Sequence, residues 1–141
     1  MPRVTYAFTV WTLASMLQSC GHSQTSAPAA LITFALCGDS SAGVQTLTVR
    51  TTNGAFIDEA ERQLSGGVRR VPVFDLVDGP GPDAQWSWHV DDTTPRFADF
   101  TVEVCDGCPR TVEANKALWL SSILRYCPAT AFVTRVTRFA E

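Results

Sequence analysis

The sequence predicts an α+β fold in which a mostly antiparallel sheet carries two helices on one face, in the order β-β-α-β-β-β-α-β. Short segments with alternating apolar and polar residues predict the strands, and two segments with apolar residues at helical spacing predict the helices. Turns rich in Gly and Pro separate successive strands, which favours hairpins. The chain has 141 residues, of which 45% are hydrophobic, so residues 31–141 are long enough for one domain with a hydrophobic core.

The predicted domain begins with a hairpin and a helix. Residues 31–37 form a short apolar segment, and residues 45–50 alternate Leu and Val against Thr after a turn that contains Gly and Ser. Four apolar residues of the next segment repeat at helical spacing: Phe56, Ile57, Ala60 and Leu64. Asn53 or Thr52 can cap the start of this helix, and a Gly-Gly pair ends it.

A second hairpin is predicted in the middle of the domain. Residues 68–77 return as a strand before a turn of Gly and Pro, and residues 86–91 and 98–105 are then expected to pair across a polar DDTTP connection. The side chains expected to face the core from this hairpin are Trp86, Trp88, Val90, Ala98, Phe100, Val102 and Val104. Pro109 begins the second helix, and residues 131–138 form the last strand.

Residues 1–19 resemble a signal peptide, because one arginine precedes an apolar segment that is too short to span a membrane. The segment ends in Leu-Gln-Ser-Cys, which is similar to a bacterial lipobox and predicts that Cys20 is acylated and becomes the N-terminus. Cleavage near Ala27 to Ala30 without a lipid, or an uncleaved leader, are the alternatives. Residues 20–30 are small and polar, as in a flexible tether. We therefore expect a membrane-anchored lipoprotein of the cell envelope, with secretion as the alternative.

Four cysteines follow Cys20, namely Cys37, Cys105, Cys108 and Cys127. An even number in an exported chain favours structural disulfides, and four cysteines allow three pairings. The CDGC sequence before a helix is also a place where a redox-active thiolate is stabilised. Too few strands follow it for a thioredoxin topology, and the isolated Cys37 and Cys127 do not fit the two close pairs of a zinc site. No cofactor is expected.

The charged residues give further candidates for a site. An acidic group could bind calcium, but it lacks the alternating ligands of a calcium loop, so we interpret it as a solvated face; its members are Asp91, Asp92, Asp99, Glu103 and Asp106. His89 and Glu103 share the polar face of the predicted second hairpin, and without a nucleophile nearby we interpret them as a structural hydrogen bond. The net charge of −3 gives no support for a nucleic-acid partner.

A series of short motifs resembles the BP-seventy-four-related family of small secreted α+β domains. The motifs, in order, are WSWHVD, FTVEVCDGCP, VEAN, a Trp at position 119 and the Cys-Pro pair at 127 and 128. The resemblance covers most of the segment from Leu31 to Phe139. The chain departs from the family pattern at Ala129, where the pattern has Trp.

The resemblance also implies a disulfide pairing. Cys105 and Cys127 belong to the family pattern, whereas Cys37 and Cys108 are additional, so the implied bridges are Cys105–Cys127 and Cys37–Cys108. This pairing requires the second helix to end near Leu120, because a straight helix that continued further would separate the first pair by about 25 Å.

These observations predict an exported, lipid-anchored and non-catalytic binding or interaction module of the cell envelope, with an envelope or extracellular partner. One alternative is a small envelope hydrolase or thiol redox enzyme that uses His89, Glu103 and the CDGC segment. A second alternative is a calcium-dependent adhesion module that uses the acidic residues.

Overall fold

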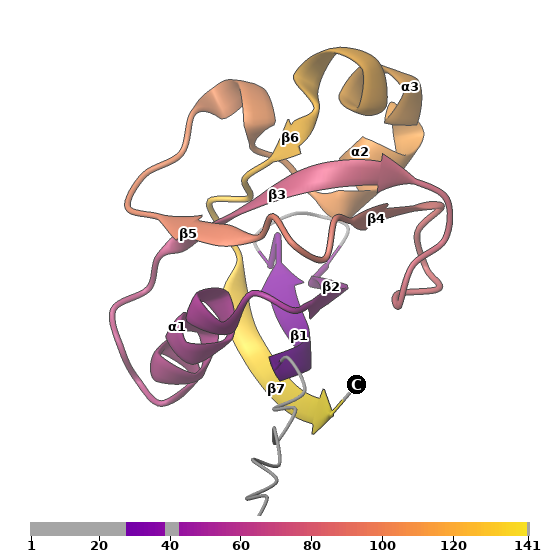
Figure 1. Cartoon of the computed structure of the whole chain (residues 1–141). Helices are drawn as coiled ribbons and strands as arrows, with labels where there is room; N and C mark the ends of the chain where they lie inside the picture. The colour runs from indigo at the N-terminus through magenta and orange to yellow at the C-terminus, as the bar shows by residue number, and fades with distance from the viewer. Residues whose placement is uncertain (1–27, 39–42, 141) are drawn as a thin grey trace, which may run out of the picture.

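The computed structural model describes residues 28–38 and 43–140, which form two antiparallel sheets (Figure 1). The first sheet has the order β2-β1-β7 and consists of β1 (Pro28–Leu36), β2 (Gln45–Thr51) and β7 (Phe132–Ala140). In the second, β3 (Val71–Asp78) pairs with three short strands: β4 (Trp88–Val90), β5 (Arg96–Ala98) and β6 (Arg125–Tyr126). The α+β class and the antiparallel pairing are confirmed, with two sheets in place of the one that was expected.

Helix α1 (Gly54–Leu64) begins where its capping residue predicts. The Asn53 side chain accepts a hydrogen bond from the backbone N–H of Phe56 at 3.2 Å, which satisfies one of the free N–H groups of the first turn. Phe56 then stacks on Phe97 of β5, with 4.3 Å between the ring centroids. The apolar face of α1 thus joins the first sheet to the second.

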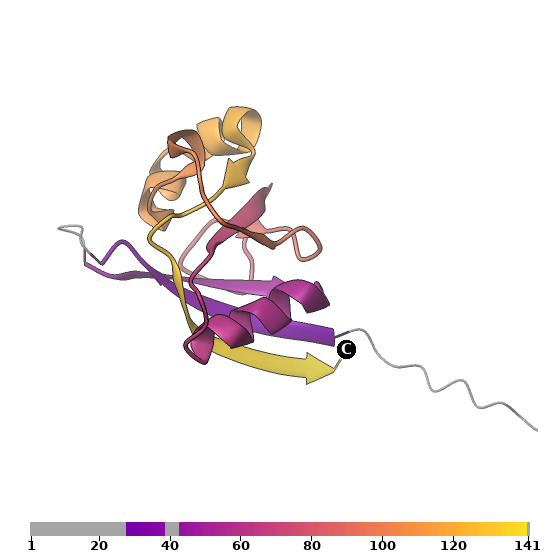
Figure 2. The same ribbon diagram turned by 90° about the vertical axis from the view of Figure 1, so that its left-hand side faces the viewer.

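The second predicted helix is divided into short pieces. These are α2 (Pro109–Ala114), α3 (Lys116–Leu118) and the π-helical turn η2 (Trp119–Ile123), and the 3-10 turn η1 (Glu103–Cys105) precedes them. Figure 2 shows the end of the α2–η2 segment beyond β3, on the side away from the first sheet, whereas α2 reaches the first sheet, where the Arg110 N–H donates to the Gln45 side chain of β2 at 2.9 Å. The π-helical turn is followed by Leu124 in the left-handed conformation, which stops the helix before β6.

The hydrophobic core lies between the two sheets. Trp88, Tyr126, Phe34 and Phe74 are its largest fully buried side chains. The Trp88 and Trp119 rings both make edge-to-face contacts with the Tyr126 ring, at centroid distances of 5.8 and 5.7 Å. The prediction that Trp86 and Trp88 belong to the core is confirmed, since 8% and 1% of their surfaces are exposed.

The second hairpin, predicted between residues 86–91 and 98–105, is wrong. β4 pairs with residues 76–78 of β3 and β5 pairs with residues 71–73, so both strands pair with β3 instead of with each other. β5 also ends at Ala98, and the rest of its predicted strand leaves the sheet. An alternating pattern predicts that a segment is extended, but not which strand it pairs with.

The first strand begins at Pro28, three residues before the predicted start of the domain at Leu31. Ala29 and Ala30 are buried and pair with β7. The predicted signal peptide, the acylated Cys20 and most of the predicted tether lie outside the described residues. Within 28–38 and 43–140, none of the helices has the length and apolar character needed to cross a bilayer.

Candidate binding groove

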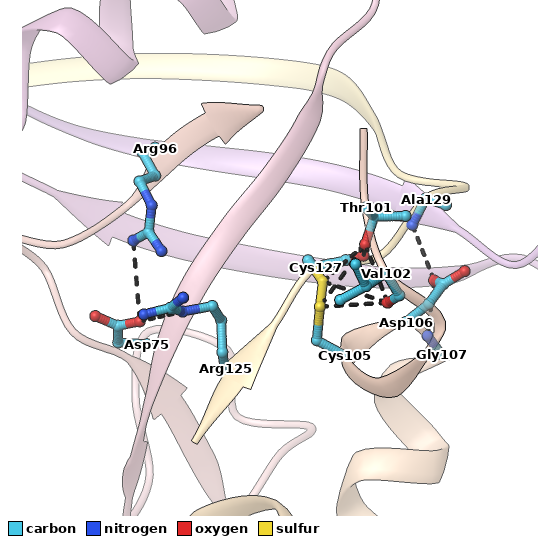
Figure 3. Close-up of a disulfide and its surroundings, with 10 residues drawn as sticks. All are labelled: Asp75, Arg96, Thr101, Val102, Cys105, Asp106, Gly107, Arg125, Cys127 and Ala129. Atoms are coloured by element: carbon cyan, nitrogen blue, oxygen red, sulfur yellow. Dashed lines mark hydrogen bonds and ion pairs between the residues drawn. A yellow bond between two sulfur atoms is a disulfide. The ribbon is translucent and has the colours of Figure 1, made fainter. Parts of the chain in front are cut away.

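The segment that follows β5 is held by Cys127 instead of by a sheet. Thr101 donates a hydrogen bond from its hydroxyl to the Cys127 carbonyl at 2.9 Å, and the Cys127 N–H donates to the Cys105 carbonyl at 2.7 Å. Cys105 and Cys127 also form a disulfide, with 5.2 Å between their Cα atoms (Figure 3). These contacts direct the side chains of Thr101 and Cys105 toward Cys127.

The apolar residues of this segment consequently face outward. Phe100, Val102 and Val104 were expected in the core, but 79%, 54% and 68% of their surfaces are exposed. The prediction failed because the chain leaves the sheet after β5 and forms the 3-10 turn η1 at Glu103–Cys105, so the alternation of a strand does not continue through Val104. Once Thr101 and Cys105 face Cys127, the apolar residues between and beside them must face solvent.

The opposite side is formed by the end of η2. The Leu124 N–H donates to the Trp119 carbonyl at 2.7 Å, and the Leu76 N–H donates to the Leu124 carbonyl at 3.3 Å. Leu124 has φ 62°, a left-handed conformation that is unfavourable for a bulky residue. Its side chain remains 55% exposed. Strained residues and π-helical turns occur frequently at functional sites.

Two adjoining hollows lie between these segments, and we refer to them together as the groove. The large hollow has a volume of about 830 Å³ and is lined by Asp75, Leu76, Val102, Val104, Cys105, Ser122, Ile123, Leu124 and Arg125. The small hollow has a volume of about 220 Å³ and is lined by Val73, Arg96, Ala98, Phe100, Thr101, Val102, Cys105, Arg125 and Cys127. Val102, Cys105 and Arg125 line both, so the hollows are continuous.

The groove carries more positive than negative charge. The Asp75 carboxylate in β3 forms ion pairs with Arg125 at 3.4 Å and with Arg96 at 3.9 Å (Figure 3). Both arginine side chains remain about half exposed, at 55% and 44%. Among the described residues, no carboxylate lines the small hollow. Two guanidinium groups therefore share a single carboxylate at this end of the groove.

The CDGC segment contributes Cys105 to the lining of both hollows and is fixed by disulfides and hydrogen bonds. The disulfides are Cys37–Cys108 and Cys105–Cys127, which are the two pairs that the resemblance implies. Cys105 and Cys108 thus belong to different bridges. Between them, the Asp106 carboxylate accepts hydrogen bonds from the N–H of Gly107 at 2.7 Å and of Ala129 at 2.9 Å, which ties this segment to the chain beyond Cys127. The α-helical residues end at Leu118 and the π-helical turn at Ile123, so no straight helix keeps Cys105 from Cys127.

The structure does not bring His89 and Glu103 together, so the predicted pair is wrong. His89 lies in β4 opposite Val77, and its Nδ1 is 2.9 Å from the Gly79 carbonyl oxygen. Glu103 lies in η1, beyond β5, which pairs with the other end of β3. The two residues were expected to be neighbours because their strands were expected to pair with each other. Both strands pair with β3 instead.

The five acidic residues considered for calcium binding have separate partners or positions. The Asp91 carboxylate accepts hydrogen bonds from the hydroxyl and N–H of Thr93, which lower its pKa. Asp92 and Asp99 form ion pairs with arginines, and Asp106 bonds to the backbone. Within the part of the chain that the structure describes, no three His, Cys, Asp or Glu side chains are grouped to hold a metal ion.

Sequence reasoning missed a polar contact between β4 and α2. The Glu113 carboxylate accepts hydrogen bonds from the Ser87 backbone N–H at 3.0 Å and from its hydroxyl at 2.7 Å. These two bonds, followed by the charge of Lys116, hold the pKa of Glu113 below its usual value. An ionised acceptor suits a structural link between the two elements. No local pattern marks this contact, because the residues are 26 positions apart.

Comparison with known proteins places most of the domain within one family model. The model described as the BP-seventy-four N-terminal domain matches residues 31–140, which includes every strand and helix from β1 to β7 apart from the first three residues of β1. No curated protein and no solved structure matches the chain.

Proposed function

Since the chain belongs to the BP-seventy-four N-terminal domain family, we propose that it is an exported, lipid-anchored and non-catalytic binding module of the cell envelope. The observation that carries this proposal is the exposed apolar groove beside η2. Four large apolar side chains are more than half exposed along it: Phe100, Val102, Val104 and Leu124. Exposed apolar surface grouped in one place is typical of a surface that binds a partner.

Export is supported by the two disulfides, because such bridges form and persist in oxidising compartments. The start of β1 argues against cleavage at the Ala30 end of the alternative range, Ala27 to Ala30. Cleavage at Ala30 would remove Pro28 and Ala29, which pair with the end of β7. Processing at Cys20 would leave β1 intact behind a short tether.

The position of the groove suits a module held at its N-terminus. Figures 1 and 2 show the start of β1 at one end of the domain and the segment between β5 and α2 at the other. A lipid attached ahead of β1 would therefore direct the groove away from the membrane, toward partners in the surrounding compartment.

The enzyme alternatives receive less support. A redox-active CDGC would need Cys105 and Cys108 to form a bridge with each other, and each is bonded to a different cysteine. The proposed hydrolase would need His89 and Glu103 in one site. His89 lies in β4, which pairs with one end of β3, whereas Glu103 follows β5, which pairs with the other end.

Cys20→Ala tests the anchor. The full chain should move from the membrane fraction to the soluble fraction of the envelope, because the substitution removes the sulfur atom that would carry the lipid. His22→Ala, in the same predicted tether, is the matched control and should stay in the membrane fraction. Intact-mass analysis of the wild-type chain should show a lipid on Cys20, and an unmodified N-terminus near Ala30 would contradict the proposal.

A further inference from the structure

We propose that the groove binds an extended peptide segment of a partner protein, with a carboxylate of the peptide at the small hollow and apolar side chains in the large hollow. This inference rests on the proposed function as a binding module and specifies the chemistry of its partner. The juxtaposition that carries it is an apolar groove with two incompletely neutralised arginines at one end.

The groove is held open by bonds on both sides. The Cys105–Cys127 disulfide and the hydrogen bond from Thr101 to the Cys127 carbonyl hold one side, and the backbone bonds of Leu124 hold the other. Val102 and Val104 therefore belong to a segment that is fixed by a disulfide and hydrogen bonds. A surface that is already shaped loses less conformational entropy when a ligand binds.

The arginines supply the charge complementarity. A guanidinium group has five N–H donors. Arg125 uses Nε for a long contact of 3.4 Å to Asp75, and Arg96 uses one terminal nitrogen for contacts of 3.9 Å to Asp75 and 3.4 Å to the Thr94 carbonyl. The remaining donors can bind an incoming carboxylate in the forked geometry that arginine favours.

The shape of the groove favours a peptide over a membrane surface or a second copy of this chain. Val102, Val104 and Leu124 line the large hollow, so their exposed surfaces border a depression that an extended chain can enter. The segment between β5 and α2, which forms one side of the groove, also lies at the other end of the domain from the start of β1, where the proposed anchor would hold the domain (Figure 2). Two hollows that share Val102 suit a strand-like chain, which would place successive side chains along the groove.

The test uses the full lipidated chain in nanodiscs of phosphatidylcholine and a panel of fluorescent octapeptides. Each peptide has one Glu followed at alternate positions by two Leu, and its matched partner has Gln in place of Glu. Fluorescence anisotropy should show that the Glu peptides bind about tenfold more tightly, or by about 1.4 kcal/mol, since Gln cannot form a charge-assisted hydrogen bond with the arginines. Peptides ending in a free or an amidated leucine distinguish a C-terminal carboxylate from a side-chain carboxylate.

Variants then assign binding to the groove. Arg96→Gln with Arg125→Gln should abolish the preference for Glu over Gln, and Val104→Asp should weaken binding of all peptides at least tenfold. Val68→Asp is the matched control, because Val68 is 83% exposed and lies outside the groove. It should bind like the wild type. Thermal melts verify that each variant is folded.

Three results would overturn the inference. They are an absence in the wild type of any preference for Glu over Gln and for a free over an amidated C-terminus, binding that survives Val104→Asp, and binding instead to phosphatidylserine vesicles or to a second copy of the chain in a manner that Val104→Asp removes. The fractionation of Cys20→Ala is a separate measurement. A chain that is lipidated but binds no acidic peptide would refute only the present inference.

Discussion

Tyr126→Phe should reveal how the hydroxyl of the central tyrosine stabilises the core at neutral pH. The Tyr126 ring is fully buried, and its hydroxyl donates a hydrogen bond to the Gly107 carbonyl at 2.9 Å. Phenylalanine keeps the ring contacts with the two tryptophans but leaves the carbonyl without this donor. A hydrogen bond contributes about 0.5–1.5 kcal/mol and an unsatisfied buried acceptor costs more, so we expect the free energy of unfolding at pH 7 to fall by about 1–2 kcal/mol.

The effect of the same substitution should become smaller at high pH. Burial, followed by the charge of Asp106, raises the pKa of Tyr126 above the ordinary value of 10.0. The unfolded chain can therefore ionise this tyrosine at a pH where the folded chain keeps it neutral. The stabilisation is complete below pH 10 and is lost as the pH rises from there toward the folded pKa, at about 1.4 kcal/mol per pH unit. The phenylalanine of the variant cannot ionise, so the stability advantage of the wild type over Tyr126→Phe should shrink as the pH rises above 10.

Urea denaturation followed by tryptophan fluorescence measures both effects. Comparing the two proteins at each pH cancels the contribution of all other titratable groups, which is common to both proteins. Tyr126→Ala serves as a second reference and should lose about 3–5 kcal/mol, because it also removes the packing of the ring. A difference between wild type and Tyr126→Phe that stays constant from about pH 8 to pH 11.5 would refute the reasoning.

Two further predictions concern the disulfides and a close backbone approach. Loss of the Cys37–Cys108 bridge through paired serine substitutions should lower the free energy of unfolding by about 4 kcal/mol, and loss of Cys105–Cys127 by about 3, because the bridges close loops with sequence separations of 71 and 22 residues. The reverse order in urea denaturation would contradict this argument. Gly81→Ala should destabilise the domain by about 1–3 kcal/mol, since its new Cβ would overlap the Cβ of His89. His89→Ala retains that Cβ and should not restore the melting temperature.

The elements governed by local signals could be predicted from the sequence. The first hairpin is confirmed by the pairing of β1 with β2, and α1 by its Asn53 cap, because a turn and a capping side chain act within a few residues. The pairing of β4 and β5 with β3 could not be predicted, because it depends on contacts between distant segments. Leu124 gives no signal either, since leucine is not a residue that favours a left-handed turn.

The groove could have been found from one relation that the sequence does contain. Cys105 and Thr101 share one face of the strand predicted over residues 98–105, and a cysteine in a structural disulfide is usually buried. Phe100, Val102 and Val104 would then have to face outward. Apolar alternation alone assigns these three residues to the core, but in this segment the burial of the cysteine outweighs it.

The arrangement of the disulfides has a consequence for the kinetics of oxidative folding. Cys105 and Cys108 are separated by only two residues, whereas their partners are Cys127 and Cys37. In the unfolded chain, the shortest loop is closed most readily, so a bridge between Cys105 and Cys108 should form before either native bridge. That bridge must then be opened by thiol–disulfide exchange, which takes seconds to hours without a catalyst. Yield of the native domain should therefore depend on a disulfide isomerase more than on the strength of the oxidant.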